Sequence, residues 1–359
     1  MASCCLYVAL AVGLAGLPSG LWAQDIVSDL ERFTTPRSGI ACPSPDQYSP
    51  IRPDPPGTAT TVGIGIFLND ISNLNDLNQT LDADVWVVVR WRDTRLADAT
   101  RGDSAAECPP PEGGLWMPSI EPENLRSRQQ FYQPRFVVDG RGVVTYARRL
   151  LVTVSYPLDL RDFPFDRHRW KFTLWPVFSR SDEMVFHALE RFNGKNDRLS
   201  IQGWHVGVPE PKASVSARVA RPGQFARFDL VIPLERESSY YAWKLGMPLT
   251  LIVLMAYGVY FIPVTNVRSQ LALSTTSMLT FIAYMIAFNA GLPKISYLTR
   301  ADLFFGGSAI LVFLGLVKSI VTIHIASEDK AGTVERLDRL GKWLYPSGMV
   351  LNVIYAFFL

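Results

Sequence analysis

The sequence predicts an all-β extracellular immunoglobulin-like sandwich followed by a four-helix all-α transmembrane bundle. Most charged residues of the 359-residue chain precede position 240. Short runs of alternating apolar and polar residues, separated by turn residues, fill positions 60–236, and four long apolar segments follow. The composition therefore changes from that of a β domain to that of a membrane domain.

Residues 1–23 are typical of a signal peptide that is removed after export. Their apolar core is followed by Pro18 and Gly20, and Ala23 is a small residue at which a signal peptidase could cut. A first membrane helix is the alternative, but the apolar run is short for a span. Residues 24–57 are rich in proline and, apart from one short helix expected at 26–33, are interpreted as an irregular N-terminal arm.

Removal of the signal peptide would take away Cys4 and Cys5 and leave Cys42 and Cys108. In an oxidising compartment these two cysteines could form a disulfide. Two separate buried thiols are the alternative.

Residues 58–239 carry the strand pattern of the expected sandwich. The first strand is expected at 61–68, and the segments 83–91 and 225–234 each have one face more polar than the other. Asp139-Gly140 is typical of a hairpin turn. Short strands at this spacing predict an antiparallel β-sandwich.

Residues 240–359 contain four segments long enough to cross a bilayer as helices, at about 243–262, 267–289, 303–326 and 343–359. The links between them carry more basic residues on the side away from the sandwich. This bias agrees with a multi-pass protein of the plasma (inner) membrane, with the N-terminal domain and the C-terminus in the periplasm or extracellular space.

The second segment is unusual because it carries many hydroxyl groups, each of which needs a partner away from water. These hydroxyls could bond to their own helix or to neighbouring helices. Alternatively, one side of the helix faces water in a pore that closes by dewetting. The residues of such a stripe recur at steps of four and three: Ala272, Thr276, Leu279, Ala283, Ile286 and Ala290.

Several function classes are poorly supported. A formal net charge of +2 does not indicate a nucleic-acid partner. His168, His187 and His205 are scattered without metal-ligand spacing, and no nucleophile motif is present. We therefore expect neither a metal nor a cofactor, and no enzyme activity.

The loop 156–170, YPLDLRDFPFDRHRW, places Pro164 between Phe163 and Phe165 and ends this core with Asp166. Taken alone, it is typical of a turn in a β domain. Together with the four apolar segments that follow, it resembles the Cys-loop superfamily of pentameric ligand-gated ion channels. Further motifs of the family match in order at 67–91, 113–124, Pro248 and 292–294.

The chain departs from the family pattern at the two ends of this loop. Tyr156 and Trp170 stand where the family has the cysteines of its defining disulfide. The bacterial members lack that disulfide too, and share a short link between the third and fourth helices. The sequence is therefore similar to the bacterial type.

The resemblance implies a homopentamer in a lipid bilayer, with the stripe of each second helix lining a central pore for inorganic ions and Leu279 at the gate. It also implies a small-molecule agonist site between subunits. An amine held against aromatic faces is one candidate ligand; a zwitterion at Glu121, or no agonist at all, are alternatives. The expected site residues are Trp86, Glu121, Tyr146, Trp175 and Phe225.

Coupling between the sandwich and the helices would follow an ion pair of Asp166 with Arg236. The full set of expected coupling residues is Asp76, Phe163, Pro164, Phe165, Asp166, Arg236, Lys294 and Tyr297. Arg268 lies at the expected inner mouth of the pore, where a ring of arginines would favour anions. The resemblance to bacterial members nevertheless favours cations weakly. A non-conducting membrane sensor and a proton-gated channel are the alternative functions.

Overall fold

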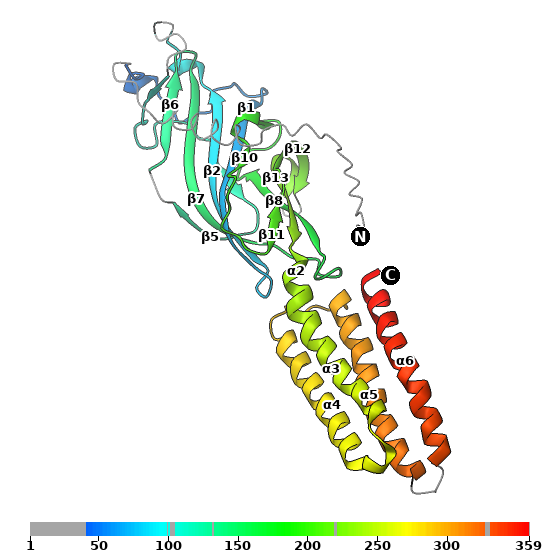
Figure 1. Cartoon of the computed structure of the whole chain (residues 1–359). Coiled ribbons are helices and arrows are strands. Elements are labelled where there is room, and N and C mark those ends of the chain that lie inside the picture. The colour runs from blue at the N-terminus through cyan, green and yellow to red at the C-terminus, as the bar shows by residue number, and fades with distance from the viewer. Residues whose placement is uncertain are drawn as a thin grey trace, which may run out of the picture.

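The computed structural model describes residues 41–98, 100, 105–130, 133–218, 221–326 and 331–358. The expected signal peptide and the first part of the N-terminal arm lie outside the described residues. A β domain and a bundle of helices follow each other along the long axis of the molecule (Figure 1).

Two β-sheets form the first domain. Within the described residues, the eight-stranded sheet has the order β10-β1-β2-β7-β6-β3, with β5 beside β7 and β9 beside β1, and the five-stranded sheet has the order β11-β13-β8-β4, with β12 beside β13. The strands of the first sheet are β1 (Thr60–Asn75), β2 (Thr80–Arg92), β3 (Ala105–Glu107), β5 (Leu125–Gln130), β6 (Arg135–Asp139), β7 (Val143–Ser155), β9 (Met184–Ala188) and β10 (Gly194–Lys195). Those of the second are β4 (Ile120–Pro122), β8 (Arg167–Pro176), β11 (Trp204–Val206), β12 (Glu210–Arg218) and β13 (Arg221–Arg236).

The core lies between the sheets and is built by alternation along the strands. Val85, Val87 and Val89 of β2 point inward to a cluster that includes Phe172 and Phe228 from the opposite sheet. The intervening Trp86 and Val88 belong to a separate cluster on the outer face. One buried face per strand is the arrangement that the alternating sequence predicts.

The hairpin between β6 and β7 turns at Asp139–Gly142, where the Gly142 N–H donates to the Asp139 carbonyl. Gly142 has a φ of +75°, and a Cβ there would lie 2.3 Å from the Asp93 carbonyl oxygen. The glycine that this turn requires is therefore Gly142 rather than Gly140.

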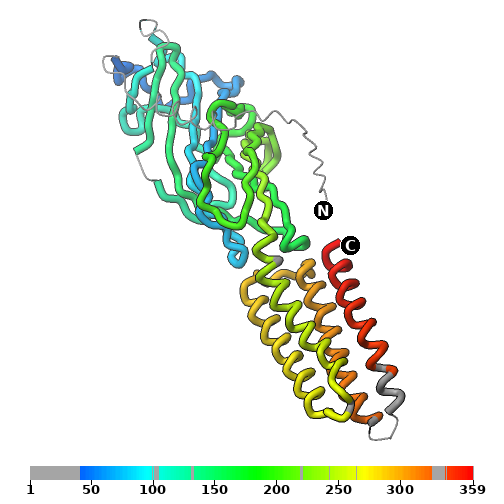
Figure 2. Tube along the Cα trace, in the orientation of Figure 1, coloured from blue at the N-terminus to red at the C-terminus, as the bar shows by residue number. Residues whose placement is uncertain are grey.

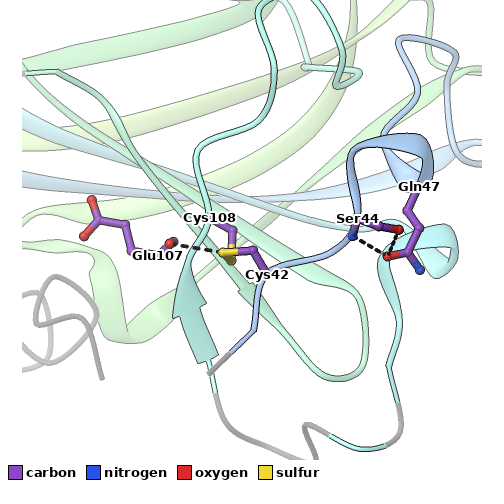
Figure 3. Close-up of a disulfide and its surroundings, with 5 residues drawn as sticks. All are labelled: Cys42, Ser44, Gln47, Glu107 and Cys108. Atoms are coloured by element: carbon purple, nitrogen blue, oxygen red, sulfur yellow. Dashed lines mark hydrogen bonds between the residues drawn. A yellow bond between two sulfur atoms is a disulfide. The ribbon is translucent and has the colours of Figure 1, made fainter. Parts of the chain in front are cut away.

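The arm that precedes β1 is joined to the β domain by a disulfide between Cys42 and Cys108, whose Cα atoms are 5.5 Å apart (Figure 3). Cys108 directly follows β3 and is buried. Hydrogen bonds to carbonyls of the arm also hold it, since the Trp116 backbone N–H donates to the Ser49 carbonyl and the Arg95 guanidinium donates to the Ile51 carbonyl. The described part of the arm is thus packed on the domain.

The second domain consists of four long helical segments. The first runs over Ser238–Phe261 as α2 (Ser238–Tyr241), a π-helical turn (Ala242–Gly246), α3 (Met247–Tyr257) and a 3₁₀ turn (Gly258–Phe261). The others are α4 (Val267–Asn289), α5 (Arg300–Ala326) and α6 (Ala331–Phe358). The segments Ser238–Phe261, Val267–Asn289 and Arg300–Ile325 are long and apolar enough to cross a membrane.

The last helix differs most from the expected range of 343–359, because α6 begins already in the charged link. Asp338 of α6 forms an ion pair with the buried Lys318 of α5, at 2.7 Å. One turn later, the Lys342 carbonyl accepts a hydrogen bond from Tyr257, at 2.8 Å. Contacts with two other helices therefore stabilise the polar first half of α6.

We expect replacement of both Cys42 and Cys108 by serine to lower the free energy of unfolding of the β domain by about 4 kcal/mol, because the disulfide closes a long loop. Denaturant unfolding of the purified full chain, followed by tryptophan fluorescence, measures the change. Reduction of the wild-type protein should reproduce it, and the double variant should not respond to the reductant. Equal stability of variant and wild type would contradict the prediction.

Candidate functional site

The end of the β domain that faces the helices carries the turn between β1 and β2 and the loop between β7 and β8 (Figure 2). Both segments meet Arg236, the last residue of β13. Its side chain is only 1% exposed and forms ion pairs with Asp76, at 2.7 Å, and with Asp166, at 2.8 Å. The structure therefore brings together three residues that the sequence placed in the coupling region, and that lie far apart along the chain.

Aromatic rings and a further hydrogen bond complete the surroundings of Arg236. Its guanidinium lies 4.2 Å from the ring centre of Trp204 and 5.1 Å from that of Phe163. It also donates to the Tyr241 hydroxyl, at 3.2 Å. Burial alone would lower the pKa of Arg236, but the hydrogen bonds to Asp76 and Asp166 outweigh it and raise this pKa.

Asp166 also accepts a hydrogen bond from His168, at 2.6 Å, and both side chains are buried. Burial would raise the pKa of the Asp166 carboxyl, but the hydrogen bonds from His168 and Arg236 outweigh it and leave the pKa lowered. With His168 neutral, Arg236 supplies one positive charge to this cluster, and Asp76 and Asp166 supply two negative charges. Sequence reasoning named Asp166 and Arg236 and placed His168 near the coupling region, but it missed Trp204, because only the register of β8, β11 and β13 brings this ring to the pair.

The remaining coupling residues join the loop between β7 and β8 to the helices. Phe163 and Pro164 are buried, and Phe163 packs on Tyr241 and Phe288, with ring centres 5.0 and 6.4 Å apart. Phe165 is half exposed and lies 5.7 Å from Phe357 of α6. The loop thus contacts the first, second and fourth helical segments.

The segment after α4 makes the second connection between the domains. The Tyr297 hydroxyl accepts from the Leu160 N–H, at 3.0 Å, and donates to the Leu158 carbonyl, at 3.3 Å. Lys294 is exposed and lines a cavity of about 580 Å³ together with Asn78 of the β1–β2 turn. Sequence reasoning missed the ion pair of Arg300 with Asp162, at 2.8 Å, which joins the same loop to the start of α5.

The expected agonist residues lie on two different surfaces. Glu121, Trp175 and Phe225 share the outer face of the five-stranded sheet, where Glu121 is directly opposite Trp175 in the pairing of β4 with β8. Glu121 is exposed, whereas Trp175 and Phe225 are each 3% exposed. Trp86 is partly exposed on the outer face of the eight-stranded sheet. These two faces cannot form one pocket within a single subunit.

Tyr146 lies on neither of these two outer faces. Its side chain is 7% exposed and packs in the core between the sheets, with the ring centre of Phe136 4.9 Å away. The cause is strand alternation, which turns Ala147 of β7 to the outer face and Tyr146 inward.

Helix α4 presents two different sides. Its buried residues are Gln270, Ser274, Ser277 and Phe281. The residues of the stripe Ala272, Thr276, Leu279, Ala283, Ile286 and Ala290 are all exposed, including Leu279 at 70% and Ile286 at 63%. At 100° per residue, the stripe lies about 180° around the helix from the buried side. The described residues of the subunit therefore leave most of the Leu279 and Ile286 side chains uncovered.

Four hydroxyls of α4 bond to carbonyls of their own helix. Ser274, Thr275, Ser277 and Thr280 each donate to the carbonyl four residues earlier, at 2.8–2.9 Å. The first interpretation of these hydroxyls therefore holds for these four. Thr276, on the exposed stripe, makes no such side-chain bond to another described residue.

Comparisons with known proteins agree with this architecture. A family model for the neurotransmitter-gated ion-channel ligand binding domain matches residues 46–205. A proton-gated ion channel of Gloeobacter violaceus is 24% identical over 355 residues, which cover 96% of this chain and 90% of the relative. Proteins of this kind are channels rather than enzymes. These similarities are those of a bacterial-type pentameric ligand-gated ion channel, and Tyr156 and Trp170 stand in place of the cysteines of that family's defining disulfide.

Proposed function

We propose that the chain forms a homopentameric ion channel whose pore is lined by α4. The observation that carries the proposal is the exposed stripe on the side of α4 opposite its buried face. Leucine and isoleucine side chains exposed to this extent favour a position next to other copies of the chain or at a closed pore. Around a central axis, Thr276 would wet the lower pore.

Leu279 is the proposed gate. Five leucine side chains that converge on a narrow axis offer an ion no replacement for its hydration shell, so the closed pore excludes ions by dewetting. Ala283 and Ile286 continue this apolar region on the same side of the helix. Ala272 and Ala290 are the two ends of the stripe.

The proposed agonist site lies between adjacent subunits. The outer face with Glu121, Trp175 and Phe225 supplies one side, and Trp86 of the neighbouring copy supplies the other. Because these surfaces belong to different sheets, a shared site requires a second subunit. Ligand closure there would change the orientation of the β domain, which the cluster around Arg236 transmits to the helices.

Proton gating is a second candidate, favoured by the contact of His168 with Asp166. Protonation of His168 would bring the buried charges from one positive and two negative to a balance of two and two. The other titratable groups around His168 are Tyr156, whose ring centre is 6.1 Å away, and Asp76 and Tyr241 on the far side of Arg236. The similarity to a proton-gated channel supports this candidate as well.

The sequence weakly favoured cations as the permeant ions, but the geometry of α4 leads us to propose anions. Arg268 is exposed and precedes Ala272 by one helical turn, on the side of the stripe. Five arginines at the inner mouth would attract anions and repel cations.

Leu279→Ala is expected to open the channel more easily, because it removes the apolar constriction. Voltage clamp of the expressed chain should detect a standing current that the wild type lacks. Leu251→Ala is the matched control, since Leu251 is an exposed leucine of α3 away from the stripe. Correctly assembled protein that passes no current with or without Leu279→Ala would instead support the non-conducting sensor.

The reversal potential under a salt gradient measures selectivity. For the wild type we expect a value near the chloride equilibrium potential, and for Arg268→Glu a shift toward the cation potential, because the ring changes from positive to negative. A cation-selective wild type whose reversal potential is unchanged in Arg268→Glu would contradict the proposed role of this residue.

The response to acid separates His168 from the carboxylates. Because the pKa of Asp166 is lowered, its stabilising charge is present above the ordinary carboxyl pKa and is lost only as the pH falls through the lowered value. Mild acid therefore leaves Asp166 ionised. We expect current evoked by steps between pH 8 and pH 5 in the wild type and its loss in His168→Gln. His205→Gln, an exposed histidine of β11, is the control. An unaltered pH response in His168→Gln would exclude this proton site.

A further inference from the structure

The outer face of the five-stranded sheet carries three arginines around Trp175, which we call the arginine cluster: Arg218, Arg221 and Arg227. The guanidinium carbons of Arg218 and Arg227 each lie 5.3 Å from the ring centre of Trp175. Arg221 donates a hydrogen bond to the carbonyl of Val177, two residues after Trp175. The cluster is thus built from β8 and both strands of the β12–β13 hairpin.

Hydrogen-bond donors outnumber acceptors in the arginine cluster. Arg227 forms an ion pair with Asp229, at 2.9 Å, and Asp229 also accepts from the Thr173 hydroxyl. Among the described residues, no acceptor bonds to the guanidinium of Arg218. The indole N–H of Trp175 is buried and likewise has no acceptor in the part of the chain that the structure describes. A missing acceptor is what an anionic ligand would supply.

An amine fits this surface poorly. A ligand cation held by Trp175 needs access to the face of the ring. Two guanidinium groups already lie at cation–π distance from that ring, and they would repel a third cation. The aromatic residue that the family resemblance offered for amine binding is therefore occupied by positive charge of the chain itself.

The positive charge continues along the same face. A cavity of about 210 Å³ is lined by Arg227 of β13 and by Arg169 and Lys171 of β8. Glu123 is the carboxylate among the lining residues. Arg169 is neutralised by Glu210, at 2.7 Å, and Arg227 by Asp229, which leaves Lys171 as the basic lining residue without an ion pair among the described residues.

We infer that the arginine cluster binds a small carboxylate through Arg218, with Arg221 and Arg227 beside it. This inference rests on the agonist site proposed above and names its ligand class. Arginine suits the task because its planar fork matches a carboxylate with two parallel hydrogen bonds. Glu121, opposite Trp175, would exclude a second carboxylate group from that side of the site and would attract an ammonium group of a zwitterionic ligand.

Titration calorimetry of the purified full chain tests the inference with two probes of the same ring and opposite charge, benzoate and benzylamine, and with butyrate as a second monocarboxylate. We expect benzoate and butyrate to bind and benzylamine not to bind. Arg218→Gln should weaken carboxylate binding about tenfold, because it removes a charge-assisted contact.

Lys212→Gln is the control, since it removes one positive charge from the same strand about 20 Å away. It should leave the affinity unchanged. Binding of benzylamine in preference to the carboxylates, absence of carboxylate binding, or equal carboxylate affinity in Arg218→Gln and the wild type would each overturn the inference. Because binding is measured without current, these results are distinct from failure of the channel proposal, which Leu279→Ala tests.

Discussion

The buried guanidinium of Arg236 is the interaction on which the two domains depend. It ends the longest strand of the five-stranded sheet, lies directly before the first helical segment, and holds carboxylates from two separate loops. An unpaired charge at this depth would be costly, so Asp76 and Asp166 must both stay in place. Since each carboxylate belongs to a different loop, their positions relative to the helices are coupled through one side chain. The rings of Trp204 and Phe163 exclude water and strengthen these contacts.

Helix α4 differs between its two sides. The buried side of this helix satisfies its hydroxyls through the helix backbone and packs Phe281 against Phe305. The opposite side leaves Leu279 and Ile286 70% and 63% exposed. A helix that is well packed on one side and apolar but unpaired on the other favours assembly with further copies. The pore proposal rests on this difference between the two sides of α4 rather than on the hydroxyl groups of the helix.

The sequence predicted the fold class, because the fold class depends on periodicity within single elements. Prediction from the sequence was less accurate where contacts between segments far apart in the chain determine the structure. The first strand was expected to end near residue 68, but β1 continues to Asn75 because its polar second half still pairs with β2. Helix α6 begins at Ala331 because Asp338 meets Lys318 of another helix. The bounds of β1 and of α6 each depend on a partner that the local sequence does not contain. Tyr146 was expected to contact a ligand because of the family resemblance, whereas alternation along β7 turns its side chain into the core.

Arginine appears in two chemical settings in this β domain, and the number of acceptors around each distinguishes structure from recognition. Arg236 is buried, and two carboxylates and a hydroxyl accept its hydrogen bonds, so it has little capacity left for a ligand. Arg218 is partly exposed, lies against an aromatic ring, and has no acceptor among the described residues. In the sequence the two residues look alike, as single arginines near the ends of neighbouring strands. Only the paired strands reveal that Arg218 faces Trp175 without a counter-charge, and this deficit determines which ligand charge the outer face can accept.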